Sequence, residues 1–151
     1  EPGAMKRKPR PQKEPIHHGL NTFIIYYPIA MVVTALSVFI YVFQVQGDLV
    51  KAQTMTWLVI VMFELYQAFV CRSIRYNVFK VGPFKNKWLI IAVLASLVMS
   101  IVAIFIPALH PIFNTTSITI SEFLFIVLIS SSGAIIIEVS KILNNRKEAP
   151  I

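Results

Sequence analysis

The chain has 151 residues, of which 56% are hydrophobic and only 14% charged, and this composition excludes an ordinary soluble domain and indicates a membrane protein. Lys and Arg outnumber Asp and Glu by 14 to 7, an excess that in a soluble chain would suggest nucleic acid as a partner. Because these basic residues flank apolar stretches, they indicate orientation in a membrane, and we expect a lipid bilayer and no nucleic acid as partner.

Four stretches reach the length of about 20 predominantly apolar residues that a helix needs to cross a bilayer. Each is expected to be helical, because backbone groups inside lipid find no water and must bond within their own segment. In chain order the expected spans are 22–44, 54–71, 88–106 and 123–140. The predicted fold is an all-α membrane protein. Residues 22–140 form a four-helix transmembrane bundle between a basic, Pro-rich segment (1–21) and a tail (141–151).

Two of the spans contain residues that disturb a helix. Pro28 lies near the start of the first span, where it removes a backbone hydrogen bond and is expected to kink or adjust the helix. The run from Ser130 to Gly133 interrupts the centre of the fourth span. Small residues suit close helix packing, and serine hydroxyls can bond back to carbonyls one turn earlier, so this stretch is retained as a span.

Basic residues are distributed unevenly around the four spans. Thirteen of the fourteen lie in the N-terminal segment, in the loop between the second and third spans, or in the tail. Only Lys51 lies in the two remaining loops. By the positive-inside rule this asymmetry predicts a multi-pass integral membrane protein whose N- and C-termini are both cytoplasmic.

Glu64 lies in the middle of the second span. The helical rise places it roughly 13 Å from Met55 and roughly 10 Å from Cys71, near the centre of the bilayer. On insertion scales an acidic residue there costs about 2.5 to 3.5 kcal/mol, against a gain of about 0.3 to 0.6 kcal/mol for each Leu, Ile, Val or Phe. A helix with such a residue inserts only marginally by itself and needs partner helices.

Gln67 shares a helix face with Glu64, because the two residues are three positions apart. A carboxylate beside an amide offers hard oxygen ligands of the kind that Ca²⁺ or Mn²⁺ accept, and equally a protonatable site. The alternative is a protonated or hydrogen-bonded glutamate that only holds helices together. The cost of intramembrane charge favours a functional role, and Glu64 with the adjacent Gln67 is therefore the candidate cation site.

Two further glutamates have simpler expected roles. Glu122 lies at the start of the fourth span, where an acid complements the helix N-terminus. Glu138 lies three residues before Lys141, and the two are expected to pair while both extend toward the membrane surface. The sequence contains no Gly-rich phosphate loop, no metal-binding Cys pair and no HExxH motif, so no catalytic or cofactor-binding residue is assigned.

Several motifs occur in a fixed order over about 140 residues: 5–16 (MKRKPRPQKEPI), 63–73 (FELYQAFVCRS), 86–89 (NKWL), 107–113 (PALHPIF), and Glu138 followed by Lys141. They resemble landmarks of the P-type cation-transporting ATPases, in the calcium-pump-like (type II) branch. In that family a basic Pro-rich loop precedes the seventh span, F-E-x-x-N-A-L-x-x-R-S lies in the eighth, and N-x-W-L and P-x-x-x-x-F surround the ninth.

The resemblance implies a function for the chain and a role for its membrane glutamate. The chain would be the C-terminal support module, spans seven to ten, of an ATP-driven cation pump with calcium as the expected ion. Glu64 would correspond to an eighth-span glutamate that contributes to a calcium site, with Gln67 where an asparagine is usual. The partners implied are the remaining transmembrane and cytoplasmic domains of the pump, and an isolated fragment would tend to self-associate.

The resemblance also implies what this chain cannot do alone. The D-K-T-G-T phosphorylation motif and the T-G-E-S actuator motif of the family do not occur in this sequence. ATP hydrolysis, with its Mg²⁺ and ATP, would therefore belong to the parent pump, and the chain by itself is expected to be no ATPase and to hold no cofactor.

Two other interpretations stay open. The chain could be a free-standing small membrane protein, derived from a pump tail, that serves in assembly or regulation. A start codon at Met5 would support this interpretation, whereas an upstream frame encoding D-K-T-G-T would support a fragment. The other interpretation is a proton or cation carrier that acts through Glu64 alone, and ion flux in liposomes that survives Glu64→Gln would exclude it.

Overall fold

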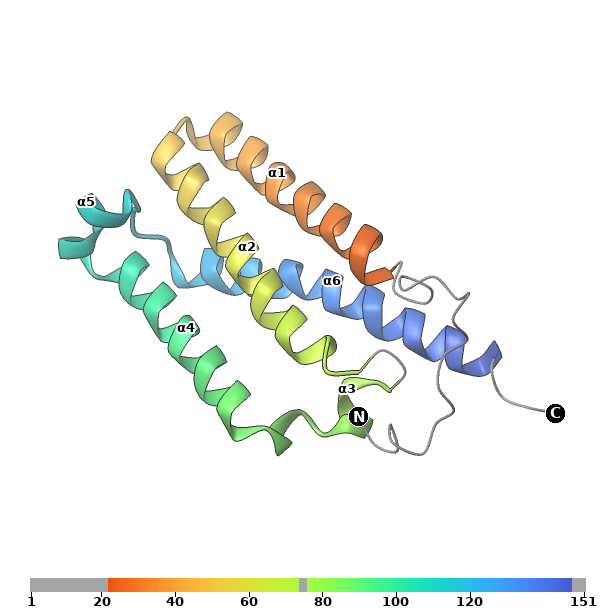
Figure 1. Ribbon diagram of the computed structural model, residues 1–151. Coiled ribbons are helices and arrows are strands. Elements are labelled where there is room, and N and C mark those ends of the chain that lie inside the picture. Colours follow the sequence, from red (N-terminus) through yellow and green to blue (C-terminus); the bar gives the residue numbers. More distant parts are fainter. Residues whose placement is uncertain (1–21, 74–75, 148–151) are drawn as a thin grey trace.

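The computed structural model describes residues 22–73 and 76–147, and within these ranges it contains helices and loops but no strand (Figure 1). Four helices are long: α1 (Tyr27–Gln46), α2 (Leu49–Val70), α4 (Lys87–Phe105) and α6 (Ile120–Lys147). Short helical turns complete the described part: η2 (Thr22–Tyr26), α3 (Val78–Val81), η3 (Pro83–Lys85), η4 (Pro107–Leu109) and α5 (His110–Phe113).

All four long helices have the length and apolar composition needed to cross a membrane. The expected all-α membrane fold with four spans is therefore confirmed. The segment 1–21, which includes the 5–16 motif, lies outside the described residues, as do 74–75 and 148–151.

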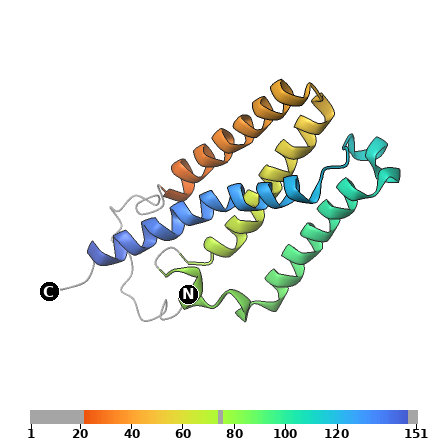
Figure 2. The ribbon, with the colours of Figure 1, turned by 180° about the vertical axis from the view of Figure 1, so that it is seen from behind.

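The helix α2 is the centre of the bundle. It packs against both α1 and α6, which also contact one another, whereas α4 lies to one side (Figures 1 and 2). The buried residues of α4 all lie in its last two turns: Ser100, Ala103 and Ile104. The start of α1, the end of α6 and the segment α3 lie at one end of the bundle, and the two loops that join α1 to α2 and α4 to α6 lie at the other.

The connection between α1 and α2 is only two residues long. Gly47 adopts a left-handed conformation (φ 68°), and its N–H donates to the Phe43 carbonyl, which ends α1. The Asp48 carboxylate then accepts a hydrogen bond from the Lys51 N–H and so begins α2. Because of this cap, α2 begins at Leu49, before the expected start of the second span at residue 54.

Pro28 occupies the first turn of α1, directly after the π-helical turn η2. A proline is tolerated there because its missing N–H would have no partner inside the helix. The π-helical turn provides the change of helical geometry that the sequence predicts near this proline. The expectation that the first span is adjusted at its start is confirmed.

Gly133 allows the three central helices to meet. The Tyr27 ring on α1 and the Phe63 ring on α2 pack edge to face with centroids 5.5 Å apart, and the Tyr27 hydroxyl donates to the Phe63 carbonyl. A Cβ on Gly133 of α6 would lie 2.5 Å from Cε1 of Phe63 and 2.8 Å from Cε2 of Tyr27. The Ser131 hydroxyl donates to the Leu128 carbonyl at 2.6 Å. The small residues in the fourth span therefore serve close packing, as predicted.

Lys141 links the end of α6 to the end of α2 through a hydrogen bond. Its Nζ lies 2.8 Å from Oε1 of Glu138, so the predicted pair is confirmed. The expectation that both side chains extend to the surface is wrong for Lys141, which is only 3% exposed and donates to the Val70 carbonyl at 2.6 Å. The second oxygen of Glu138 accepts from the Val78 N–H, so the pair also holds the start of α3. Carbonyls at a helix C-terminus lack partners within the helix, which explains why a buried ammonium is stable there.

Candidate cation site on the second long helix

Glu64 lies on α2 about 9 Å along the helix axis from Val70, and its side chain is exposed. The preceding residue, Phe63, is fully buried against α1 and α6. Successive residues on a helix point about 100° apart, so the burial of Phe63 turns Glu64 away from the packed core. The carboxylate makes no hydrogen bond or ion pair with any part of the chain that the structure describes.

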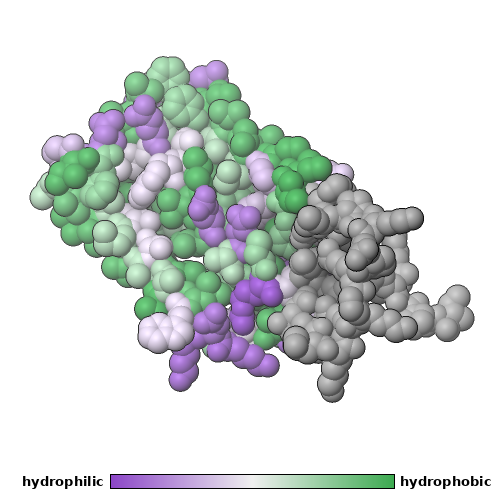
Figure 3. Space-filling view, in the orientation of Figure 1, coloured by the Kyte–Doolittle hydropathy of each residue, from purple (hydrophilic) through white to green (hydrophobic). Residues whose placement is uncertain are grey.

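A continuous stripe along α2 faces away from α1 and α6. Its members follow one another at spacings of three and four, which places them on one side of the helix. We call this stripe the α2 outer face: Gln53, Trp57, Ile60, Glu64, Gln67 and Cys71. All of these residues are exposed except Gln67, which is half-buried. Figure 3 shows hydrophilic side chains over the middle of α2 within a largely hydrophobic surface.

The rest of α2 is covered by its neighbours. Leu58, Val59 and Phe63 are fully buried, and Met55 and Met62 are nearly so. These residues contribute to the core that α2 forms with α1 and α6. The helix therefore has one side left, and α4, whose buried residues all lie in its last two turns, leaves most of that side exposed. The outer face is the side of α2 on which further helices could pack.

The structure brings Glu64 and Gln67 onto the same face, as the sequence predicts. No cluster of three or more His, Cys, Asp or Glu side chains that could hold a metal exists within 22–73 and 76–147. A calcium ion takes six to eight oxygen ligands, of which a carboxylate and an amide supply at most about three. Glu64 and Gln67 could therefore form only part of a cation site.

A cavity of about 370 Å³ that no sequence pattern predicts lies at the loop end of the α2 outer face. Its lining residues come from α2, from the end of α5 and from the loop between α5 and α6: Gln53, Thr54, Trp57, Phe113, Asn114 and Thr115. The Thr54 hydroxyl accepts from the Thr116 N–H at 3.1 Å, and this bond holds the loop against the helix. Since the two segments are about sixty residues apart in sequence, no local pattern could have revealed the cavity.

Sequence comparisons identify the family of this chain. Residues 1–143 match the profile of the family described as "Cation transporting ATPase, C-terminus". The calcium-transporting ATPase of Bacillus subtilis (strain 168) is 35% identical over 133 residues, which are 87% of this chain and 15% of that protein. The calcium-transporting ATPase 1 of Yarrowia lipolytica is 29% identical over 145 residues, which are 93% of this chain and 15% of that protein.

A third relative, the calcium-transporting ATPase type 2C member 1 of Pongo abelii, is 34% identical over 95 residues, or 63% of this chain and 10% of that protein. The chain therefore spans less than a fifth of the length of these relatives. The match begins with residue 1 and covers all four membrane helices up to the last turn of α6. The chain belongs to the family of cation-transporting ATPases, of the calcium-pump-like type, and corresponds to their C-terminal membrane region.

Proposed function

We propose that this chain is the C-terminal membrane module of an ATP-driven calcium pump and that Glu64 supplies one carboxylate ligand to the transported ion. The observation that carries the proposal is the exposed carboxylate on the α2 outer face, which finds no partner among the described residues, in a helix long and apolar enough to cross a membrane. An acidic side chain inside a bilayer costs about 2.5 to 3.5 kcal/mol unless it finds a partner. Glu64 is therefore expected to face other helices of the pump and not lipid.

The chemistry of the outer face agrees with a shared calcium site. A carboxylate oxygen from Glu64 and an amide oxygen from Gln67 are hard ligands that suit Ca²⁺. The remaining oxygens would come from parts of the pump outside this chain.

The proposed orientation places the α3 end of the bundle in the cytoplasm. Within the described residues this end carries Arg72, Lys80, Lys85, Lys87 and Lys141, whereas the opposite end carries Lys51. The positive-inside rule then places the start of α1 and the end of α6 on the cytoplasmic side. The cavity beside Gln53 and Asn114 would open on the other side of the membrane.

The test is the substitution Glu64→Gln in the pump that carries this chain. We expect the apparent affinity for Ca²⁺ in transport assays to fall about tenfold or more, because a charged ligand is replaced by a neutral one of the same shape. Glu64→Asp is the matched control, since it keeps a carboxylate at the same position of α2 and should lose less of the affinity than Glu64→Gln. Equal Ca²⁺ affinity in Glu64→Gln and the wild type would reduce Glu64 to a structural role.

The α2 outer face also favours a second candidate, a free-standing membrane protein that assembles with a larger partner through this face. The reading frame upstream of Glu1 separates the two, because a frame encoding D-K-T-G-T supports the pump module. A carrier that acts alone is the weakest candidate, because the described residues supply Glu64 with no cluster of further acidic, His or Cys ligands. We expect liposomes that contain only this chain to show no Ca²⁺ or proton flux.

A further inference from the structure

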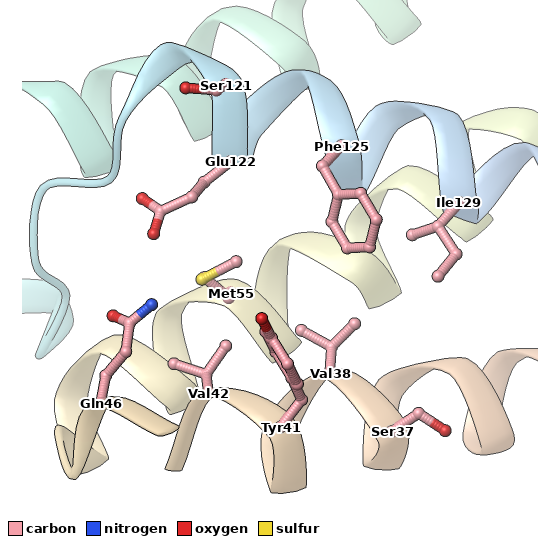
Figure 4. Close-up of a pocket in the computed structure, with 10 residues that line it drawn as sticks. All are labelled: Ser37, Val38, Tyr41, Val42, Gln46, Met55, Ser121, Glu122, Phe125 and Ile129. Carbon is pink, nitrogen blue, oxygen red and sulfur yellow. The ribbon is translucent and has the colours of Figure 1, made fainter. Parts of the chain in front are cut away.

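A groove runs between α1 and α6 at the loop end of the bundle, on the opposite side from the α2 outer face. It encloses about 490 Å³. Its floor consists of Val38, Val42 and Met55, which are almost completely buried. On its walls Tyr41 of α1 and Phe125 of α6 point toward one another (Figure 4) and are 63% and 52% exposed, so the groove opens sideways. We call it the α1–α6 groove.

The depth of the groove matches one leaflet of a bilayer. It extends along α1 from Gln46, the last residue of that helix, to Ser37, and along α6 from Ser121 to Ile129. At the helical rise these eight or nine steps correspond to about 12 to 14 Å. The hydrocarbon core of a bilayer is about 30 Å thick, so the groove reaches from one membrane surface to about its middle.

The groove is polar at its mouth, the end nearest the loop between α1 and α2, and apolar in its interior. At the mouth, Lys51 Nζ lies 2.7 Å from Oε1 of Glu122, and each of the two side chains is about a fifth exposed. The other oxygen of Glu122 accepts from the N–H and the hydroxyl of Thr119. A carboxylate has about four lone-pair sites, so one site on Glu122 remains available. The Gln46 amide extends toward the mouth opposite Glu122 (Figure 4) and makes no hydrogen bond with the described residues.

We propose that the α1–α6 groove binds one phospholipid with a primary-ammonium headgroup, phosphatidylethanolamine. One acyl chain fills the apolar interior, the ammonium donates to Glu122 and to the Gln46 carbonyl oxygen, and the phosphate lies near Lys51. The Glu122–Lys51 pair is neutral overall, which suits a zwitterion better than an anionic lipid. A choline headgroup has no N–H and could not donate to these oxygens.

The size of the groove favours a lipid chain over a protein segment. A volume of 490 Å³ lies within the range of about 300 to 1,000 Å³ typical of small-molecule sites. An α-helix about 10 Å across occupies roughly twice that volume over the same depth, so a helix from a partner or from a second copy would protrude from the groove. Because the groove opens sideways from helices that cross the membrane, lipid is the medium that reaches it.

The purified full chain is incubated in mild detergent with equimolar dioleoyl phosphatidylethanolamine, phosphatidylcholine and phosphatidylglycerol. Native mass spectrometry then counts the phospholipid molecules that each chain retains. We expect one phosphatidylethanolamine per chain, at about tenfold higher occupancy than the other two. Ile129→Trp fills the groove and should lower this occupancy about tenfold. Leu128→Trp is the matched control, because Leu128 is the neighbouring residue, is 72% exposed and does not line the groove.

The isosteric substitution Glu122→Gln separates headgroup recognition from chain binding. We expect lipid to remain bound to this variant while the preference for phosphatidylethanolamine over phosphatidylcholine disappears. Three results would overturn the proposal: equal retention of the three lipids by the wild type, equal retention by wild type and Ile129→Trp, or a dimer that Ile129→Trp dissociates. The wild-type preference is decisive even if a variant fails to fold, and circular dichroism checks the helicity of each variant.

Discussion

Gly133→Leu is expected to destabilise the bundle by about 1 to 3 kcal/mol, the usual cost of overpacking a filled core. The Cβ alone, the first atom of a new side chain, would lie 2.5 Å from the Phe63 ring, which is closer than real Cβ atoms essentially ever approach another atom. The Phe63 and Tyr27 rings also contact one another, so neither can move aside without separating α1 from α2. Replacing glycine raises helix propensity by about 1 kcal/mol at most, which is too little to compensate.

The measurement is the midpoint of unfolding in mixed detergent micelles, followed by circular dichroism. Gly133→Ala should give an intermediate midpoint, because it adds only the Cβ. Ala95→Leu is the control, since Ala95 is an exposed small residue on α4 and its enlargement meets no packed neighbour. An unchanged midpoint for Gly133→Leu would mean that α6 does not pack against α1 and α2 through this glycine.

Lys141→Met is expected to have a larger effect, a loss of about 3 kcal/mol. Removing one member of a buried ion pair costs about 3 to 5 kcal/mol, because the remaining charge is left without compensation. The lower end of that range applies here, since about a fifth of the Glu138 side chain is exposed. The substitution also leaves the Val70 carbonyl without its donor. The contact between the ends of α2 and α6 should therefore weaken first.

Two readouts test this prediction. The unfolding midpoint should fall, and the amide of Val78, which donates to Glu138, should exchange its hydrogen faster than in the wild type. The double variant Lys141→Met with Glu138→Gln should lose less than the sum of the single losses, because it removes the unpaired charge. Ile142→Met is the control, since Ile142 is the exposed neighbour of Lys141. Equal midpoints in Lys141→Met and Ile142→Met would contradict a stabilising role for the buried lysine.

The sequence was sufficient for the helical architecture. Length and apolar composition alone predict that each of the four stretches is a helix, because a bilayer leaves the backbone no other way to satisfy its hydrogen bonds. The helix ends were less predictable. The cap formed by Asp48 extends α2 beyond its apolar stretch, and such a cap depends on a single polar side chain.

The candidate site was predictable in part. The spacing of Glu64 and Gln67 places them on one helix face whatever the rest of the chain does. That this face is the one left uncovered could not be read from the sequence, since it also carries the apolar Trp57 and Ile60, and the covered side includes the polar Thr54. It follows from the contacts of Leu58, Val59 and Phe63 with α1 and α6, which occupy the opposite face.

The membrane class, the four long helices, the family and the residue pair at the centre of the candidate site could all be predicted from the amino-acid sequence. These properties depend on local composition, on spacing within one helix and on ordered motifs. The burial of Lys141, the contact of three helices at Gly133 and the groove between α1 and α6 with Glu122 at its mouth became visible only in the folded chain. Lateral packing depends on the shapes of side chains far apart in the chain, whereas helix formation in lipid depends on each segment alone.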